Sequence, residues 1–264
     1  MFQNGRDVNL KDKRTKRTGV LPIVNYTDLK KKIINSIERL NSNVNYQIHS
    51  FDLHNLNQVN EYQKILETQK YRGYTHRYSQ CFYQTWKPVI CNHVIQQCND
   101  GDIVYYIDCS RYHPDGFEYN VEKMIKYLQD NHQYQGIVAG AITKQSNIEL
   151  IDHRILDVIC KTMKIDCKNK YHVMASWFIF TKNQTSIEFF KEWVKWTFTP
   201  VKDYIDIHGN KEPFLGVISG LPEQSILSAL VVKYRLHCFP GFKNYNDILE
   251  KIEKDEELSL QIIY

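Results

Sequence analysis

The segment 101–108 (GDIVYYID) constrains the fold of this chain more than any other. Every residue between Asp102 and Asp108 is apolar or aromatic, so a strand formed there has two apolar faces. Such a strand belongs in the middle of a sheet that is covered by helices on both sides. The preceding Asn99-Asp100-Gly101 is a turn signal, which indicates that the strand begins directly after it.

Strand-like and helix-like segments alternate along nearly the whole chain. Further strands are predicted at 19–26, 46–53, 136–142 and 173–181. Helical spacing or composition is found at 28–40, 58–69, 79–97, 121–130, 152–163, 186–196, 222–233 and 244–254. This alternation predicts an α/β fold with a mostly parallel sheet flanked by helices. Because no linker divides the chain, we expect a basic flexible tail at 1–18 and a single domain at 19–264.

Composition excludes several classes of protein. Hydrophobic residues make up 42% of the 264 residues, enough for a packed globule, and no apolar run reaches the ~18 residues of a membrane span. Residues 1–17 are polar and basic and lack the apolar core of a secretory leader, so we expect a cytoplasmic protein. The seven cysteines are scattered without a Cys-x-x-Cys pair, which favours free thiols over a zinc cluster.

Ligands of α/β sheets bind at the carboxyl ends of the strands, which directs attention to Asp108 and Ser110. Asp108 has two interpretations. It is either a helix cap that satisfies nearby backbone donors, or a ligand of a metal ion or a ribose. A diphosphate needs a divalent cation, and Mg²⁺ or Mn²⁺ prefers oxygen ligands such as a carboxylate.

Short motifs elsewhere in the chain bear on this choice. They are, in order, Arg72-Gly73, Trp86-Lys87-Pro88, Gly101-Asp102-Ile103-Val104, Tyr106-Ile107-Asp108 and Glu223-Gln224-Ser225. The ordered set, over roughly residues 44–240, resembles a family of nucleotide-sugar-dependent glycosyltransferases with a GT-A-like (Rossmann-like) fold, found in bacteria and giant viruses.

The abundance of Asn, Lys, Ile and Tyr is typical of an AT-rich genome, such as that of a large DNA virus. For a viral chain the expected location is the host cytoplasm or the virus factory, with the virion as an alternative.

The resemblance implies a nucleotide-sugar donor, a divalent Mn²⁺ or Mg²⁺ ion, and a hydroxyl acceptor on a glycan, a protein or a lipid. Asp108 would bind the metal, with the small Ser110 leaving room beside it. Arg72 and Lys87 would stabilise the charge that grows on the diphosphate leaving group. Trp86 would form part of the donor site.

Glu223 and Gln224 would form an active-site pair. The Glu223 carboxylate would contact the sugar or serve as general base for the acceptor hydroxyl.

Each of these residues also has a structural interpretation. Arg72 would be a surface residue beside a glycine turn, and Lys87 a snorkelling side chain on an amphipathic helix. Trp86 would be a core residue. Glu223 would be an acidic residue favoured in a first helical turn by the helix dipole.

The chain departs from the family pattern at several points, and these departures motivate a second hypothesis. Ser110 replaces a glycine, Glu223 replaces an aspartate, and Gly220-Leu221-Pro222 replaces a basic pair. A catalytically inactive GT-A-fold protein that acts in binding or as a scaffold is the alternative.

Secondary candidates for a metal site are His113, Asp115 and His237. A third hypothesis, nucleic-acid binding through the basic tail, lacks any supporting signature, so nucleic acid is not an expected partner.

Overall fold

A computed structural model describes residues 86–107, 137–202, 204, 214–216, 222–239 and 261–262, together with the single residues 31, 35, 47, 49, 51 and 59. The described helices are α4 (Trp86–Gln97), α6 (Asn147–Leu150), α7 (His153–Met163), α8 (Gln184–Thr197) and α9 (Pro222–Tyr234). The described strands are β1 (Ile103–Ile107), β2 (Ile137–Ser146), β3 (Tyr171–Thr181), β4 (His237–Phe239) and β5 (Gln261–Ile262). The predicted strand after Gly101 is therefore confirmed, as are the predicted helices that correspond to α7, α8 and α9.

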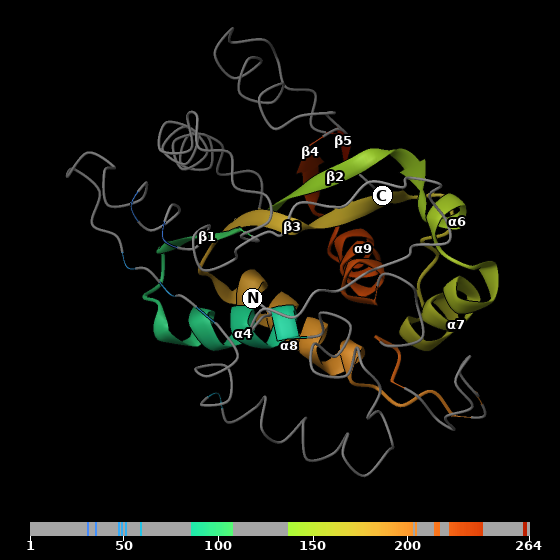
Figure 1. Cartoon of the computed structure of the whole chain (residues 1–264), viewed down its shortest axis with the longest axis horizontal. Coiled ribbons are helices and arrows are strands. Elements are labelled where there is room, and N and C mark those ends of the chain that lie inside the picture. Colours follow the sequence, from blue (N-terminus) through green and yellow to red (C-terminus); the bar gives the residue numbers. More distant parts are fainter. Residues whose placement is uncertain are drawn as a thin grey trace, which may run out of the picture.

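The described strands form one sheet in the order β1-β3-β2-β4-β5 (Figure 1). Strands β1 and β2 both pair antiparallel with β3, whereas β4 pairs parallel with β2 and antiparallel with β5. It follows that β1, β2 and β4 run in one direction, and that β3 and β5 run in the other. The carboxyl ends of β1, β2 and β4 therefore point to the same edge of the sheet, where β3 begins.

The expected parallel character and the central position of β1 stay predictions. Among the described strands the β2–β4 pairing alone is parallel, and β1 is the first strand in the order. The predicted strands at 19–26 and 46–53 lie outside the described residues.

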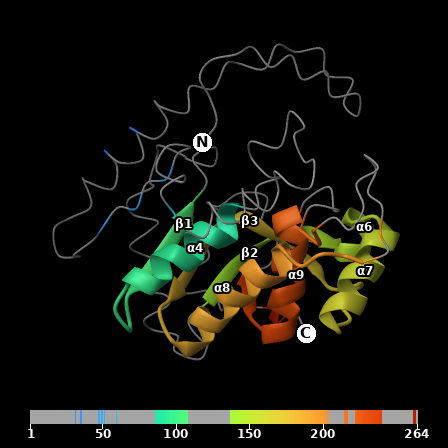
Figure 2. The same ribbon diagram turned by 90° about the horizontal axis from the view of Figure 1, so that it is seen from below.

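Helices α4, α8 and α9 lie side by side against one face of the sheet (Figures 1 and 2). Aromatic side chains of β3 and α8 fill the space between the two layers. Phe178 and Phe180 of β3 are buried against Phe190 and Trp193 of α8, with ring centroids 4.4 Å apart for Phe180 and Phe190. The aromatic face of α8 is thus a core face that packs against the sheet.

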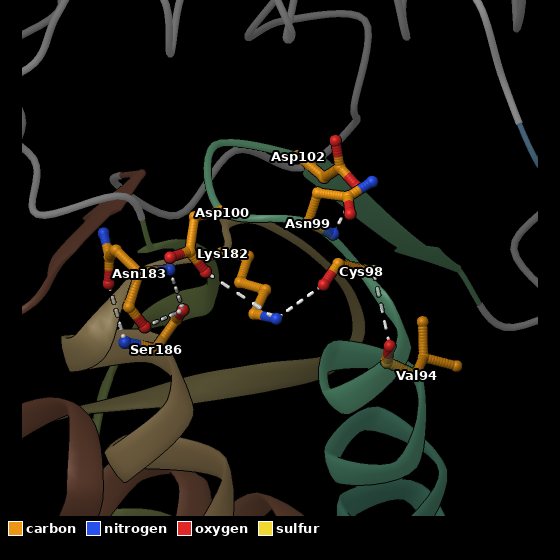
Figure 3. Close-up of polar contacts among 8 residues, drawn as sticks. All are labelled: Val94, Cys98, Asn99, Asp100, Asp102, Lys182, Asn183 and Ser186. Atoms are coloured by element: carbon orange, nitrogen blue, oxygen red, sulfur yellow. Dashed lines mark hydrogen bonds and ion pairs between the residues drawn. The ribbon is translucent and has the colours of Figure 1, made fainter.

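A tight turn at 98–102 joins α4 to β1 and fixes the direction of the helix (Figure 3). Gly101 adopts a φ of 91°, which favours glycine, and Asp102 accepts a hydrogen bond from the Asn99 backbone N–H at 2.7 Å. Lys182, at the end of β3, donates to the Cys98 carbonyl at 2.5 Å. The carboxyl end of α4 therefore lies beside the end of β3.

The pairing between β2 and β3 shifts register near the middle of β3. The pairing passes from Ala139↔Phe178 to Ala141↔Val173, so that two steps along β2 correspond to five along β3. Side chains from the helix layer bond to the β3 backbone here. Lys87 Nζ donates to the Ala175 carbonyl at 3.3 Å, and the Val173 N–H donates to Ser228 Oγ at 2.8 Å.

Candidate functional site

Two helices begin at the edge where β1, β2 and β4 end. Helix α4 contacts Ala175 through Lys87 near its start and Lys182 through Cys98 just beyond its end, so it runs parallel to β3 and antiparallel to β1. Helix α9 leads into β4 after two residues, and Ser228 at its middle contacts Val173, close to the beginning of β3, so the first turn of α9 lies beyond that contact. The first turns of α4 and α9 thus lie toward the same edge of the sheet.

Trp86 and Lys87, two of the predicted donor-binding residues, stand at the start of α4. Trp86 is half-buried and packs against the core, and its buried Nε1 makes no hydrogen bond with the described part of the chain. Lys87 is 1% exposed, and its amine donates to the Ala175 carbonyl 3.3 Å away and lies 5.8 Å from the Trp86 ring centroid. The interpretation of Lys87 as a snorkelling surface side chain is therefore wrong.

The predicted pair Glu223 and Gln224 belongs to the first turn of α9. Only the backbone of Glu223 is described. Gln224 is half-buried, and its side chain interacts with the imidazole of His172. Its backbone carbonyl accepts a hydrogen bond from Ser228 Oγ at 2.7 Å, one helical turn further on. The structure thus brings Gln224 toward the beginning of β3.

The remaining predicted residues cannot be located in the same way. Arg72, Asp108, Ser110, His113 and Asp115 lie outside the described residues. Asp108 follows the last residue of β1 directly in the chain. His237 is the first residue of β4, and its side chain is not described. Within the described ranges, no three His, Cys, Asp or Glu side chains converge on a point that would hold a metal ion.

A buried polar cluster at this edge was not predicted from the sequence. His172 and Asn147 are fully buried, and His172 Nδ1 lies 2.9 Å from Asn147 Oδ1 and 3.4 Å from Ser228 Oγ. Burial lowers the pKa of His172 from 6.5 to about 4, and the interaction with Gln224 opposes this shift only in part. The imidazole is therefore neutral at pH 7.

The sequence held one signal for this cluster. His172 adjoins the strand predicted at 173–181, and a polar residue that enters a buried strand needs a partner. Its partners Asn147 and Ser228 are 25 and 56 residues away, so no local spacing connects them. The cluster becomes visible only when the sheet and α9 are assembled.

Comparison with known proteins assigns no family. No family model matches this chain, and neither a curated protein nor a solved structure is significantly similar to it. Among the described helices, none combines the length and the apolar character that crossing a bilayer requires.

Proposed function

We propose that this chain is a GT-A-like glycosyltransferase that moves a sugar from a nucleoside-diphosphate-sugar donor to a hydroxyl acceptor on a glycan, a protein or a lipid. The observation that carries the proposal is the common edge. Strands β1, β2 and β4 end there, and the motifs around Trp86 and Gln224 begin the two helices that start there. In α/β sheets this edge is where ligands bind.

The predicted site residues suit the chemistry of sugar transfer. Asp108 directly follows β1, and a carboxylate is a suitable ligand for the Mn²⁺ or Mg²⁺ ion that would neutralise the donor diphosphate. Glu223 stands in the first turn of α9, where the helix dipole keeps a carboxylate ionised. An ionised carboxylate can accept the proton of the acceptor hydroxyl as that oxygen attacks the sugar. Arg72 would balance the phosphate charge.

The first experiment identifies the donor. A thermal-shift screen with a panel of nucleotide sugars and Mn²⁺ should raise the melting temperature with a specific donor. A ligand at a hundredfold excess over its Kd stabilises a protein by about 2.7 kcal/mol. The absence of a shift with every nucleotide sugar would contradict the proposal.

The second experiment is Asp108→Asn, which keeps the shape of the side chain and removes its charge. Donor turnover should fall by at least about a hundredfold, equivalent to ~2.7 kcal/mol of lost transition-state stabilisation. The melting temperature without ligand should hold or rise, because functional carboxylates are often locally unfavourable for stability.

A matched control for Asp108→Asn is Asp152→Asn, an exchange at the exposed N-cap of α7. It should leave donor turnover unchanged. If Asp108→Asn keeps the turnover and the Mn²⁺ response of the unmodified protein, the assignment of Asp108 is wrong, and with it most of the donor site.

A catalytically inactive binding or scaffold protein of the same fold is the second candidate. The burial of Lys87 favours it, since an amine that is committed to a strand carbonyl does not face a diphosphate at the surface. The two candidates separate when a donor that binds in the thermal-shift screen is incubated with the protein. The glycosyltransferase hydrolyses or transfers the donor, whereas the scaffold protein binds it and releases it intact.

A further inference from the structure

Two cysteine thiols meet where α7 ends and the chain turns toward β3. Cys160 belongs to the last turn of α7, and Cys167 lies four residues before β3. Both cysteines carry free thiols, and their sulfur atoms are 3.5 Å apart. Two sulfurs this close need only a small side-chain rotation to form a disulfide bond, which is about 2.05 Å long.

The turn that follows α7 holds the two cysteines together. Lys164 adopts a φ of 57°, in the left-handed region, and reverses the chain directly after the helix. The backbone N–H groups of Lys164 and Ile165 both donate to the Cys160 carbonyl, the second at 3.0 Å. Bonds of this kind close the carboxyl end of a helix, so the chain folds back over the last turn of α7. Cysteines that are seven residues apart in the sequence therefore have their side chains in contact.

The two thiols differ in their access to solvent. Cys167 is fully buried, and its carbonyl accepts hydrogen bonds from Asn147 Nδ2 at 2.8 Å and from the Lys170 N–H at 3.2 Å. Burial raises the pKa of the Cys167 thiol, which keeps this thiol protonated at pH 7. Cys160 is half-buried, so a small molecule dissolved in water reaches its sulfur before that of Cys167.

The segment around Cys160 is positively charged. Between residues 157 and 170 the chain carries four lysines and two aspartates, which gives a net charge of +2. One of the two aspartates, Asp157, pairs with Lys168 at 2.5 Å, whereas Lys161 and Lys164 are exposed beside the end of α7. Such a surface favours the approach of an anionic reagent, and oxidised glutathione is an anionic disulfide.

We propose that Cys160 and Cys167 are a reversible redox pair, which a small-molecule disulfide such as oxidised glutathione converts to an internal disulfide bond. Cys160 loses its proton to water, and its thiolate attacks one sulfur of the glutathione disulfide, which releases one glutathione. Cys167 then loses its proton and attacks Cys160 Sγ, which releases the second glutathione. The two cysteines together lose two electrons and two protons, and oxidised glutathione takes up both to become two thiols.

The internal disulfide joins α7 to the segment that supports α6. The carbonyls of Lys170 and Lys168 accept hydrogen bonds from the N–H groups of Asn147 at 2.7 Å and Ile148 at 2.9 Å. A bond between the two cysteines restricts the unfolded chain, so the oxidised protein is more stable than the reduced one. In reducing compartments, disulfides of this reversible kind sense the redox state. The pair needs neither a sugar donor nor a metal ion, so it is independent of the proposed glycosyltransferase function.

Peptide mapping of the full chain tests the pair. The protein is incubated with oxidised glutathione, its remaining thiols are blocked, and it is digested with trypsin without reduction. Cleavage after the flanking Arg and Lys residues places Cys160 in the peptide 155–161 and Cys167 in the peptide 165–168. These two peptides should be linked after oxidation, and an excess of reduced glutathione should separate them again. The absence of the linked pair would overturn the proposal.

The melting temperature measures the effect of the bond on the fold. The oxidised protein should melt about 5 °C above the reduced protein, because the bond closes a loop of the unfolded chain. The Cys160→Ser variant cannot form the bond, so the same treatment should leave its melting temperature unchanged. An equal rise in this variant would show that oxidation at another cysteine is the cause, and no rise in the unmodified protein would contradict the restraint on α7.

Two serine variants test the order of the steps. In Cys167→Ser the second step is blocked, so one glutathione should remain bound to Cys160. In Cys160→Ser the buried Cys167 should stay unmodified. The matched control is Cys98→Ser, which removes another half-buried thiol and should leave the linked pair intact. Glutathione bound to Cys167 in Cys160→Ser would overturn the assignment of Cys160 as the thiol that reacts first.

Discussion

The amine of Lys87 lies inside the protein, at the place where β3 leaves the register of β2. A backbone carbonyl that loses its ladder partner in a buried setting needs another donor. Lys87 supplies one to Ala175 across the interface between α4 and the sheet. The same region of β3 takes a second side-chain partner from α9, where Ser228 accepts the Val173 N–H. Single residues of the helix layer thus stabilise an irregular stretch of the strand.

We predict that Lys87→Met destabilises the fold. Methionine keeps the length of the side chain but leaves the Ala175 carbonyl without this donor, which should lower the free energy of unfolding by about 1–3 kcal/mol. Urea denaturation measures the change. Lys191→Met, at an exposed position of α8, is the matched control and should have almost no effect. Equal stability of the two variants would show that the bond to Ala175 contributes nothing.

The sequence could not reveal this role of Lys87. A lysine beside a tryptophan at a helix start is compatible with a phosphate contact, with a surface position and with a buried bond to a strand. The choice depends on the register shift of β3, which two distant segments produce together. The same holds for His172, whose hydrogen-bond partner Asn147 lies 25 residues earlier in α6.

Among the elements, α8 shows how closely a local sequence pattern predicts the bounds of a helix. Its apolar periodicity predicts a helix at 186–196, and the observed helix is Gln184–Thr197. The start lies earlier because Asn183 caps the helix and pairs with Ser186 in a capping box (Figure 3).

Strand β2 ends later than its sequence predicts, since it continues to Ser146, beyond the predicted 136–142. Its last residues are polar, so hydrophobicity alone gave no sign that they pair with β3.

We predict that the cap of α8 contributes measurably to stability. Asn183 Oδ1 accepts the Ser186 N–H at 2.9 Å, and the Asn183 N–H donates to Ser186 Oγ at 3.0 Å. Asn183→Ala removes the first bond and should cost about 0.5–2 kcal/mol, whereas Asn183→Asp retains an acceptor and should cost little. Thermal unfolding of both variants decides the matter. A loss of the same size in Asn183→Asp would mean that capping is not the cause.

On the scale of the molecule, strand direction was the property that the sequence left open. An apolar run has the same composition whichever way the strand points, and the helices α6 and α7 between β2 and β3 are compatible with parallel as well as antiparallel pairing. The alternation predicted a mostly parallel sheet flanked by helices, whereas in the described part of the chain β3 runs against both of its neighbours. Because β1, β2 and β4 nevertheless share one direction, their carboxyl ends meet at one edge, as the argument for the candidate site requires.

The stability of the whole molecule should fall on acidification in two separate steps. The pKa of His172 is about 4 in the folded protein against 6.5 for a free histidine, so between these values the unfolded chain binds more protons. Stability from this source is therefore complete above pH 6.5 and is lost as the pH falls toward 4, by about 3 kcal/mol. For Asp152, the hydrogen bonds from Arg154 lower the carboxyl pKa from 3.8 to about 2. Its contribution is present above pH 3.8 and is lost only as the pH falls toward 2.

Urea denaturation at a series of pH values separates the two steps. His172→Phe should flatten the dependence between pH 6.5 and 4 and leave the lower step in place, even if the variant is less stable at every pH. Asp152→Asn should affect only the lower step, because its side chain no longer titrates. The comparison uses slopes, so other titrating groups, such as His49, whose pKa burial also lowers, contribute equally to each curve. Parallel curves for the unmodified protein and His172→Phe would mean that the buried imidazole does not resist protonation.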